Sequence, residues 1–346
     1  MKKFLSVPAA ITVLAAGTLV SCSTESQESS QSPTASETPA DSATYQEYVA
    51  LGDSYSAMGS RTAETTGPAE CFRSADNYPS LVAQHEGVKN FVDATCSSAV
   101  TADIFSTRAG SEGPIEAQLE SLTKDTDLVT ISIGGNDIGF PDIARCFQEA
   151  RAAGEESDCA SRFNRDEMTN SVNEMLFSVY NSVQQRSPEA HIMVTGYMPL
   201  ITDEGQCEDA AFISEDDRGW AVGLTNEING RIKGVSSEMQ IPFIIPENAE
   251  EHTVCTPPEQ RWTDLTGAET GAYPMHPTAR GQAPRPDPNT PELNKRRWGA
   301  AVDIKGPPPA PWRRKWVRTY LFDRAHLACS TSSLPRDHLR QACQAS

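Results

Sequence analysis

Residues 49–56 read Val-Ala-Leu-Gly-Asp-Ser-Tyr-Ser, an apolar run that leads directly into a Gly-Asp-Ser turn. A short apolar run bounded by a turn signal is typical of a buried strand, and Asp and Ser favour the start of a helix. Ser54 therefore lies where a strand gives way to a helix. Its hydroxyl is a candidate nucleophile if a base is near, and the alternative is that Asp53 and Ser54 only cap the helix.

A second strand end of this kind lies at residues 129–137, which read Val-Thr-Ile-Ser-Ile-Gly-Gly-Asn-Asp. The paired glycines permit tight backbone conformations directly after a buried strand. They place the side-chain amide of Asn136 at the end of that strand, where it can donate a hydrogen bond to a developing oxyanion. The alternative is a glycine turn in which Asn136 is only a cap.

Short β-rich runs alternate with longer helical stretches between residues 45 and 283. This alternation predicts an α/β fold in which helices cover both faces of a parallel sheet. In such sheets the site lies beyond the carboxyl ends of the strands. Strands are predicted at residues 48–51, 90–94, 128–133, 191–195 and 243–245, and helices at 78–85, 114–122, 163–185 and 220–239.

Elimination among the six histidines leaves one candidate base. His276 lies in the segment Tyr-Pro-Met-His-Pro-Thr, a loop directly before a possible final helix. A lone loop histidine is usually only solvated, but after Gly-Asp-Ser and Gly-Gly-Asn-Asp in that chain order a base is favoured. The others lie in a predicted helix, at the start of a predicted strand, in a loop near a cysteine, or in a C-terminal segment of different composition: His85, His191, His252, His326 and His338.

Three blocks together resemble a known family. Residues 52–56, 134–137 and 276–278 are similar to the signature blocks of the SGNH (GDSL) hydrolases, in the variant of the actinobacterial secreted lipase/esterase branch. The resemblance covers residues 45–283. It implies a three-layer α/β/α sandwich with a flavodoxin-like parallel sheet, and a serine-esterase mechanism.

The resemblance also implies a role for each matching residue. Ser54 attacks the ester carbonyl, and His276 acts as general base and then as general acid. The oxyanion is held by the backbone N–H of Ser54, the side chain of Asn136 and the backbone N–H of Ser98. The family has glycine where this chain has Ser98, and a serine tolerates a positive φ less well. We still expect that donor to be present.

The third member of the catalytic set departs from the family pattern. An acid often stands three residues before the histidine, and that position is Tyr273 here. Some members of the branch use a main-chain carbonyl instead, so the carbonyl of Tyr273 or Pro274 is a candidate to orient His276. Asp264 is a more distant carboxylate candidate. We expect a Ser–His dyad supported by a backbone carbonyl.

The N-terminal segment predicts export. Two lysines precede an apolar run at residues 4–20, which is interrupted by Pro8 and is typical of a secretory signal. Residues 19–22 read Leu-Val-Ser-Cys and resemble a bacterial lipobox, in which Cys22 is acylated and becomes the mature N-terminus. An ordinary signal peptide is the alternative. We therefore predict a signal peptide at residues 1–21 and a disordered Ser/Thr/Glu-rich tether at 22–44.

Cysteine usage agrees with an oxidising compartment. No two of the eight cysteines that remain after Cys22 have Cys-x-x-Cys spacing, so a zinc cluster is not expected. Six of them precede Ala283 and allow 15 pairings into disulfides. Sequential pairing is the simplest, and the resembling branch has three sequential disulfides, which here would be Cys71–Cys96, Cys146–Cys159 and Cys207–Cys255.

The net charge of −18 is a sum of unlike parts. Residues 284–346 hold 12 basic and 5 acidic residues, a net of +7, and the first 283 hold 17 and 42, a net of −25. The overall negative charge argues against general affinity for nucleic acid.

The tail at 284–346 begins with an abrupt run of prolines at 284–288. Three interpretations are open: a basic segment that engages anionic lipid or wall polymer, a disordered extension, or a shifted reading frame. We favour the last.

The sequence therefore predicts one hydrolase domain at residues 45–283. It predicts a monomeric, extracellular or lipid-anchored serine esterase or lipase that acts on carboxylic esters through an acyl-enzyme, with no metal or cofactor. A carbohydrate O-acetyl esterase is one alternative. A non-catalytic surface-binding lipoprotein with a degenerate hydrolase fold is another.

Overall fold

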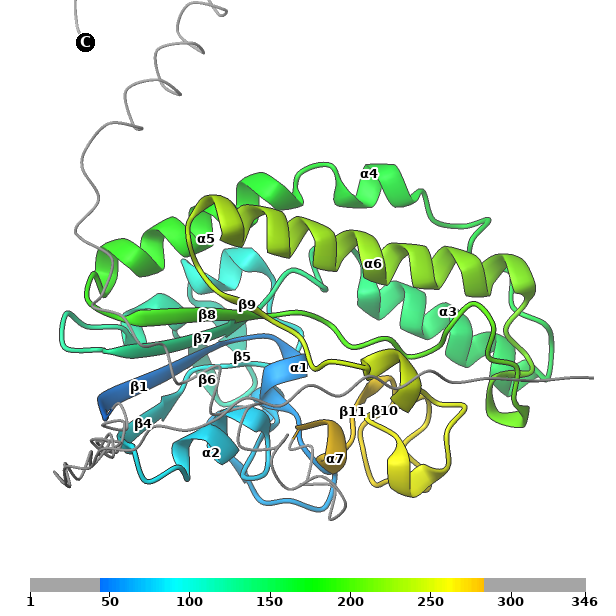
Figure 1. Cartoon of the computed structure of the whole chain (residues 1–346), viewed down its shortest axis with the longest axis horizontal. Helices are drawn as coiled ribbons and strands as arrows, with labels where there is room; N and C mark the ends of the chain where they lie inside the picture. Colours follow the sequence, from blue (N-terminus) through cyan, green and yellow to red (C-terminus); the bar gives the residue numbers. More distant parts are fainter. Residues whose placement is uncertain (1–43, 283–346) are drawn as a thin grey trace, which may run out of the picture. The chain divides into compact units, whose positions relative to one another are not determined.

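A five-stranded parallel sheet forms the centre of the fold in the computed structural model, which describes residues 44–282 (Figure 1). The strand order is β4-β1-β7-β8-β9, and every neighbouring pair is parallel. All five predicted strands are confirmed, with shifts of a few residues at their ends. Their bounds are β1 (Tyr45–Gly52), β4 (Val88–Asp93), β7 (Leu128–Ser132), β8 (His191–Thr195) and β9 (Phe243–Ile244).

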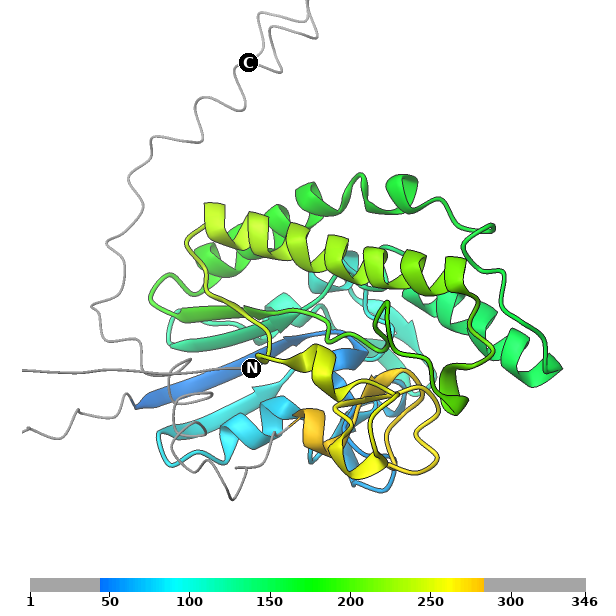
Figure 2. The same ribbon diagram turned by 45° about the vertical axis from the view of Figure 1, so that its right-hand side comes forward.

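Alternate residues of β1 face two separate cores. Val49 and Leu51 belong to the larger core, which includes apolar side chains of α3 (Phe140–Ala153), α5 (Val172–Arg186) and α6 (Glu215–Glu238). Tyr48 and Ala50 belong to the smaller core, under α2 (Tyr78–Ala83). Buried on both faces, a central parallel strand reads as a nearly continuous apolar run. Figures 1 and 2 show the resulting three layers, which confirm the predicted α/β/α sandwich.

Two helix predictions need correction, and one helix was not predicted. The predicted helix at 163–185 is interrupted at Asn170 and Ser171, so it forms α4 (Arg165–Thr169) and α5. Asn and Ser compete for backbone hydrogen bonds and favour turns over helix interiors. Helix α3 was missed, although Ile143, Cys146 and Phe147 recur at three- and four-residue spacing on its buried side and Gly154 ends it in a left-handed conformation.

The predicted helix at 114–122 is wrong. That segment holds β6 (Gly113–Ile115), which pairs with β5 (Arg108–Gly110), and then the 3₁₀ turn η3 (Gln118–Ser121). Its one helical turn buries Gln118, whose side chain accepts from the N–H of Gly52 at 2.7 Å and donates to the Gly52 carbonyl at 2.9 Å. The segment therefore supports the end of β1.

Short elements fill the loops at the carboxyl ends of the strands. Helices α1 (Ser54–Ala57) and α7 (Ala279–Gln282) are one turn each. The other short elements are β2 (Thr65–Thr66), β3 (Arg73–Ser74), β10 (Thr263–Asp264), β11 (His276–Pro277), η1 (Ala69–Cys71), η2 (Thr101–Ile104), η4 (Glu208–Ala210), η5 (Ala249–His252) and η6 (Pro258–Gln260).

Three disulfides join the cysteines in the sequential pattern expected from the resemblance. The bonds are Cys71–Cys96, Cys146–Cys159 and Cys207–Cys255. Each closes a loop of the chain, and a disulfide of this kind typically adds about 2–4 kcal/mol to the free energy of unfolding.

Several predictions lie outside the described residues. These are the signal peptide at 1–21, the lipidation of Cys22, nearly all of the tether at 22–44 and the tail at 284–346. Among residues 44–282, no helix combines the length and the apolar character that a membrane crossing requires.

Candidate active site

The turn after β1 presents Ser54 at the carboxyl edge of the sheet. Gly52 adopts a φ of +146°, and a Cβ atom there would collide with the carbonyl of Ser132 on β7, so glycine is required. Asp53 is the N-cap of α1 and accepts a hydrogen bond from the N–H of Tyr55 at 2.9 Å. Because Asp53 does the capping, the hydroxyl of Ser54 is available for chemistry.

His276 forms a hydrogen bond with Ser54, from which it is separated by 222 positions in the sequence. Its Nε2 lies 2.8 Å from the Ser54 Oγ, and its Nδ1 lies 2.7 Å from the carbonyl oxygen of Pro274. A carbonyl only accepts, so Nδ1 carries the proton and donates it, which leaves Nε2 free to accept from the hydroxyl. Met275, with a φ of 62°, makes the turn between Pro274 and His276.

Within the residues that the structure describes, neither of the other candidates forms a hydrogen bond with the His276 ring. The Tyr273 carbonyl accepts from the backbone N–H of His276 at 3.1 Å. The buried carboxylate of Asp264 accepts from the N–H groups of residues 266–267, each at 3.0 Å, and from the hydroxyl of Thr270 at 2.7 Å. Asp264 therefore fixes the loop before His276, and its backbone pairs with His276 between β10 and β11.

Burial lowers the pKa of His276 below its usual range, and the hydrogen bond to the Pro274 carbonyl raises it in part. The imidazole is therefore neutral at pH 7 and can accept the Ser54 proton. We expect the acidic limb of the kcat/KM profile to have its midpoint below about 6.5, the ordinary histidine value. A midpoint near 7 that persists in Asp53→Asn would contradict this. One that Asp53→Asn removes belongs to Asp53, because burial raises the pKa of Asp53 to about 7.

The segment 96–101 lies against the ends of both central strands. The N–H of Cys96 donates to the carbonyl of Gly52, the last residue of β1, at 2.9 Å. From the β7 side, the Asn136 amide donates to the Ala99 carbonyl at 2.8 Å. The Asp137 carboxylate accepts from the backbone and the hydroxyl of Thr101, the latter at 2.6 Å. The structure thus brings Ser54, Ser98 and Asn136 to one edge of the sheet.

Two of the expected oxyanion donors are unengaged within residues 44–282, where no hydrogen bond uses the backbone N–H of Ser54 or Ser98. Ser98 is exposed and adopts a φ of 62°, the conformation in which glycine is favoured. The serine therefore keeps the backbone geometry at some conformational cost, which is about 1–2 kcal/mol for an L-residue in this region.

That cost predicts the effect of restoring glycine. We expect Ser98→Gly to raise the free energy of unfolding by about 0.5–1 kcal/mol, since relief of strain outweighs the added freedom of the unfolded chain. Turnover should stay within about threefold of wild type, because the N–H remains. Chemical unfolding measures the first and ester hydrolysis the second. A loss of stability would show that the serine side chain has a stabilising role.

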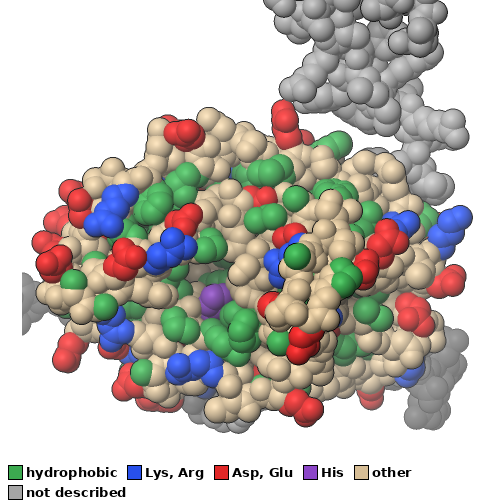
Figure 3. Space-filling view, turned by 180° about the vertical axis from the view of Figure 1, so that it is seen from behind, with side chains coloured by type: hydrophobic (Ala, Val, Ile, Leu, Met, Phe, Trp, Pro, Cys, Tyr) green, Lys and Arg blue, Asp and Glu red, His purple; other side chains and the backbone are tan. Residues whose placement is uncertain are grey.

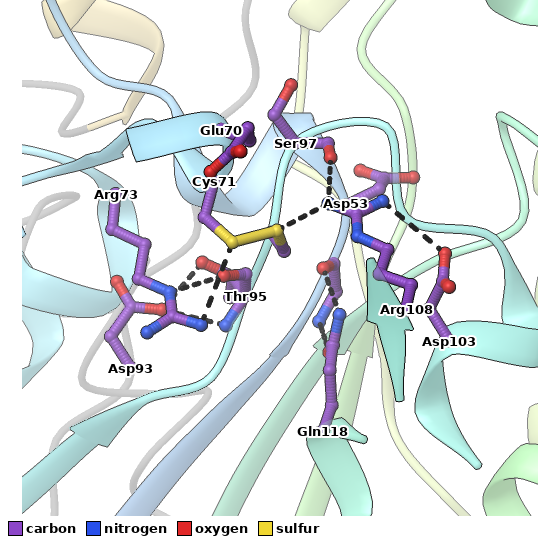
Figure 4. The surroundings of a disulfide bond; sticks show 12 residues. Asp53, Glu70, Cys71, Arg73, Asp93, Thr95, Ser97, Asp103, Arg108 and Gln118 are labelled. Carbon is purple, nitrogen blue, oxygen red and sulfur yellow. Dashed lines mark hydrogen bonds and ion pairs between the residues drawn. A yellow bond between two sulfur atoms is a disulfide. The ribbon is translucent and has the colours of Figure 1, made fainter. Parts of the chain in front are cut away.

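Two arginines support the same loop and were not anticipated from the sequence. Figure 4 shows the Cys71–Cys96 disulfide with Arg73 and Arg108 on its two sides. Arg73 donates to the Thr95 carbonyl at 2.6 Å, and Arg108 donates to the Ser97 carbonyl at 2.8 Å. The disulfide and both guanidinium groups therefore fix the backbone on either side of Cys96, next to Ser98.

No group of three or more His, Cys, Asp and Glu side chains within residues 44–282 is arranged to hold a metal ion. The described part of the chain therefore offers no candidate metal centre to set beside the serine–histidine pair.

A serine–histidine pair at the carboxyl edge of the sheet in an α/β/α sandwich is an arrangement that serine hydrolases use. Residues 50–283 match the model of the GDSL-like Lipase/Acylhydrolase family. The chain belongs to that family and is a carboxylic ester hydrolase.

Its relatives include Streptomyces lipases. The chain is 30% identical to Lipase 2 of Streptomyces coelicolor over 246 residues, which cover 68% of this chain and 82% of that one. It is similar to the crystal structure of an extracellular lipase from Streptomyces rimosus (TM-score 0.57, 28% identity, 69% and 95% covered). It is also similar to that of phospholipase A1 from Streptomyces albidoflavus NA297 (TM-score 0.55, 28% identity, 68% and 94% covered).

Proposed function

We propose that the protein is an extracellular serine esterase or lipase that hydrolyses acyl esters through an acyl-enzyme on Ser54. One observation carries the proposal: the 2.8 Å contact between Ser54 Oγ and His276 Nε2, with Nδ1 held by the Pro274 carbonyl at 2.7 Å. A hydroxyl bonded to a neutral, oriented imidazole is the arrangement that activates a serine nucleophile.

The reaction follows from these contacts. Ser54 Oγ attacks the ester carbonyl as its proton passes to His276 Nε2, and the carbonyl oxygen becomes an oxyanion. The N–H groups of Ser54 and Ser98 and the amide of Asn136 stabilise that charge. The imidazolium keeps its bond to the Pro274 carbonyl and gives its proton to the departing alcohol. Water then hydrolyses the acyl-enzyme by the same steps, with His276 again as base.

An aromatic pair formed by exposed Phe72 and half-buried Tyr273 supports an acyl chain as part of the substrate. Phe72 is 40% exposed, and its ring packs edge to face against that of Tyr273 with the ring centroids 5.7 Å apart. Phe72 follows a cysteine bonded to Cys96, and the Tyr273 carbonyl accepts from the N–H of His276. The pair therefore connects the segment 96–101, which holds the Ser98 donor, to the loop that carries His276. Figure 3 shows hydrophobic side chains around a hollow that exposes a histidine.

The relatives and the sequence support an exported location. An extracellular lipase and a phospholipase A1 are among the similar structures. Together with the predicted signal and the three disulfides, they favour a protein that is secreted or held by Cys22 at the outer face of the membrane.

Hydrolysis of a substrate series tests the function. The oxidised protein is assayed with p-nitrophenyl acetate, butyrate and octanoate and with acetylated xylan. We expect cleavage of the butyrate and octanoate esters, and Phe72→Ala should lower octanoate cleavage more than acetate cleavage. Activity on acetylated xylan alone would support the O-acetyl esterase, and folded protein inactive on every ester would support the non-catalytic lipoprotein.

A further inference from the structure

The hydroxyl of Tyr197 links the two motifs of the site. Tyr197 follows β8 and is 2% exposed. Its oxygen accepts from the N–H of Gly135 at 2.7 Å, and its hydrogen is donated to Oδ2 of Asp53 at 2.5 Å. The Gly135 N–H can only donate, so the hydroxyl proton is left for the carboxyl oxygen. One buried hydroxyl thus bridges the turn after β1 and the turn after β7.

Both hydrogen-bond partners of this hydroxyl lie next to a candidate functional residue in the chain. The Asp53 carboxyl caps α1 through the N–H of Tyr55 and so fixes the turn that carries Ser54. Gly135 directly precedes Asn136, the side-chain donor expected for the oxyanion. The position of Ser54 relative to Asn136 therefore depends on the bridge.

Tyr197 is itself held tightly. The side chain of Asn229 on α6 accepts from its backbone N–H and donates to its carbonyl, each at 2.8 Å. Its ring packs edge to face against the rings of Tyr55 and Phe140, with centroid distances of 5.0 Å and 5.3 Å. A Cβ atom on Gly135 would lie 2.9 Å from its ring, so the approach of the two is already close. The ring therefore has little freedom to move.

We propose that Tyr197 is a positioning residue for ester hydrolysis, whose hydroxyl sets the distance between the Ser54 nucleophile and the Asn136 donor. This inference rests on the proposed function. Removal of the hydroxyl leaves a buried N–H and a buried carboxyl oxygen without that partner, and the two turns can then shift apart. Small displacements of an oxyanion donor are costly because the donor acts only at the correct distance from the developing charge.

The test compares Tyr197→Phe with Tyr48→Phe on p-nitrophenyl butyrate. Tyr48 is equally buried, and its hydroxyl lies 2.7 Å from that of Thr130 in the middle of the same sheet. Both variants lose a buried hydrogen bond and some stability. We expect kcat to fall by about 10–100-fold in Tyr197→Phe alone, with KM within about threefold of wild type, since Tyr197 is buried behind the motifs.

A double-mutant cycle with Asn136→Ala separates positioning from general damage. If Tyr197 acts through Asn136, adding Tyr197→Phe to Asn136→Ala should cost less than about threefold further. Asp53→Asn breaks the same bridge from its other end and should lower kcat similarly, which provides a second variant if Tyr197→Phe fails to fold.

Each outcome is distinguishable from failure of the proposed function. The inference is overturned if folded Tyr197→Phe keeps wild-type kcat, or if its loss adds fully to that of Asn136→Ala, while wild type hydrolyses the ester and Ser54→Ala does not. An inactive wild type, by contrast, would overturn the proposed function itself.

Discussion

Ser54→Ala is expected to lower kcat/KM for p-nitrophenyl butyrate by at least about 10⁴-fold. The reason is that in the proposed mechanism Ser54 Oγ, which lies 2.8 Å from His276 Nε2, forms the bond to the acyl group. Without it the remaining donors at Ser98 and Asn136 can still bind the ester, so a small residual rate above that of water is expected. Steady-state kinetics with stopped-flow detection of p-nitrophenol measure the loss.

Ser56→Ala is the matched control for this prediction. Ser56 lies in the same turn of helix and is buried, and its hydroxyl donates to the Asp53 carbonyl at 3.0 Å. Removing it perturbs the turn without removing the nucleophile, so kcat/KM should fall by less than about tenfold. Equal losses in the two variants would contradict a specific role for Ser54.

His276→Ala is expected to lower kcat by about 10³–10⁴-fold, because Ser54 then has no base and the departing alcohol has no acid. Asp264→Asn is its control. The Asp264 carboxylate is hydrogen-bonded to the loop before His276 and not to the ring, so we expect a loss of stability and less than about tenfold loss of kcat. A thousand-fold loss in Asp264→Asn would mean that a carboxylate, not the Pro274 carbonyl, orients the histidine.

The central features of the site were predictable because they follow strand ends. An apolar run that leads to Gly-Asp-Ser or Gly-Gly-Asn-Asp indicates both a buried strand and the turn after it. Since parallel strands align their carboxyl ends, Ser54 and Asn136 were expected at one edge. His276 was found by elimination and chain order, because a sequence gives no measure of a contact across 222 residues.

The orienting group could not be chosen from sequence, because every residue carries a carbonyl. Only the backbone around Met275, with its φ of 62°, decides that Pro274 and not Tyr273 faces the imidazole. Gln118 and Tyr197 were missed for a related reason. Their contacts join residues 66 and 144 positions apart in the chain, and a buried amide or phenol has no local pattern that marks its partner.

The most direct test of the account is the covalent modification of Ser54. The oxidised protein is incubated with diethyl p-nitrophenyl phosphate, digested and analysed by mass spectrometry while residual esterase activity is followed. The account predicts one diethylphosphoryl group on Ser54, formed in step with the loss of activity. The label should be absent from Ser54→Ala, and labelling should be greatly slowed in His276→Ala. Complete inactivation with the label on another residue, or full esterase activity with Ser54 modified, would contradict it.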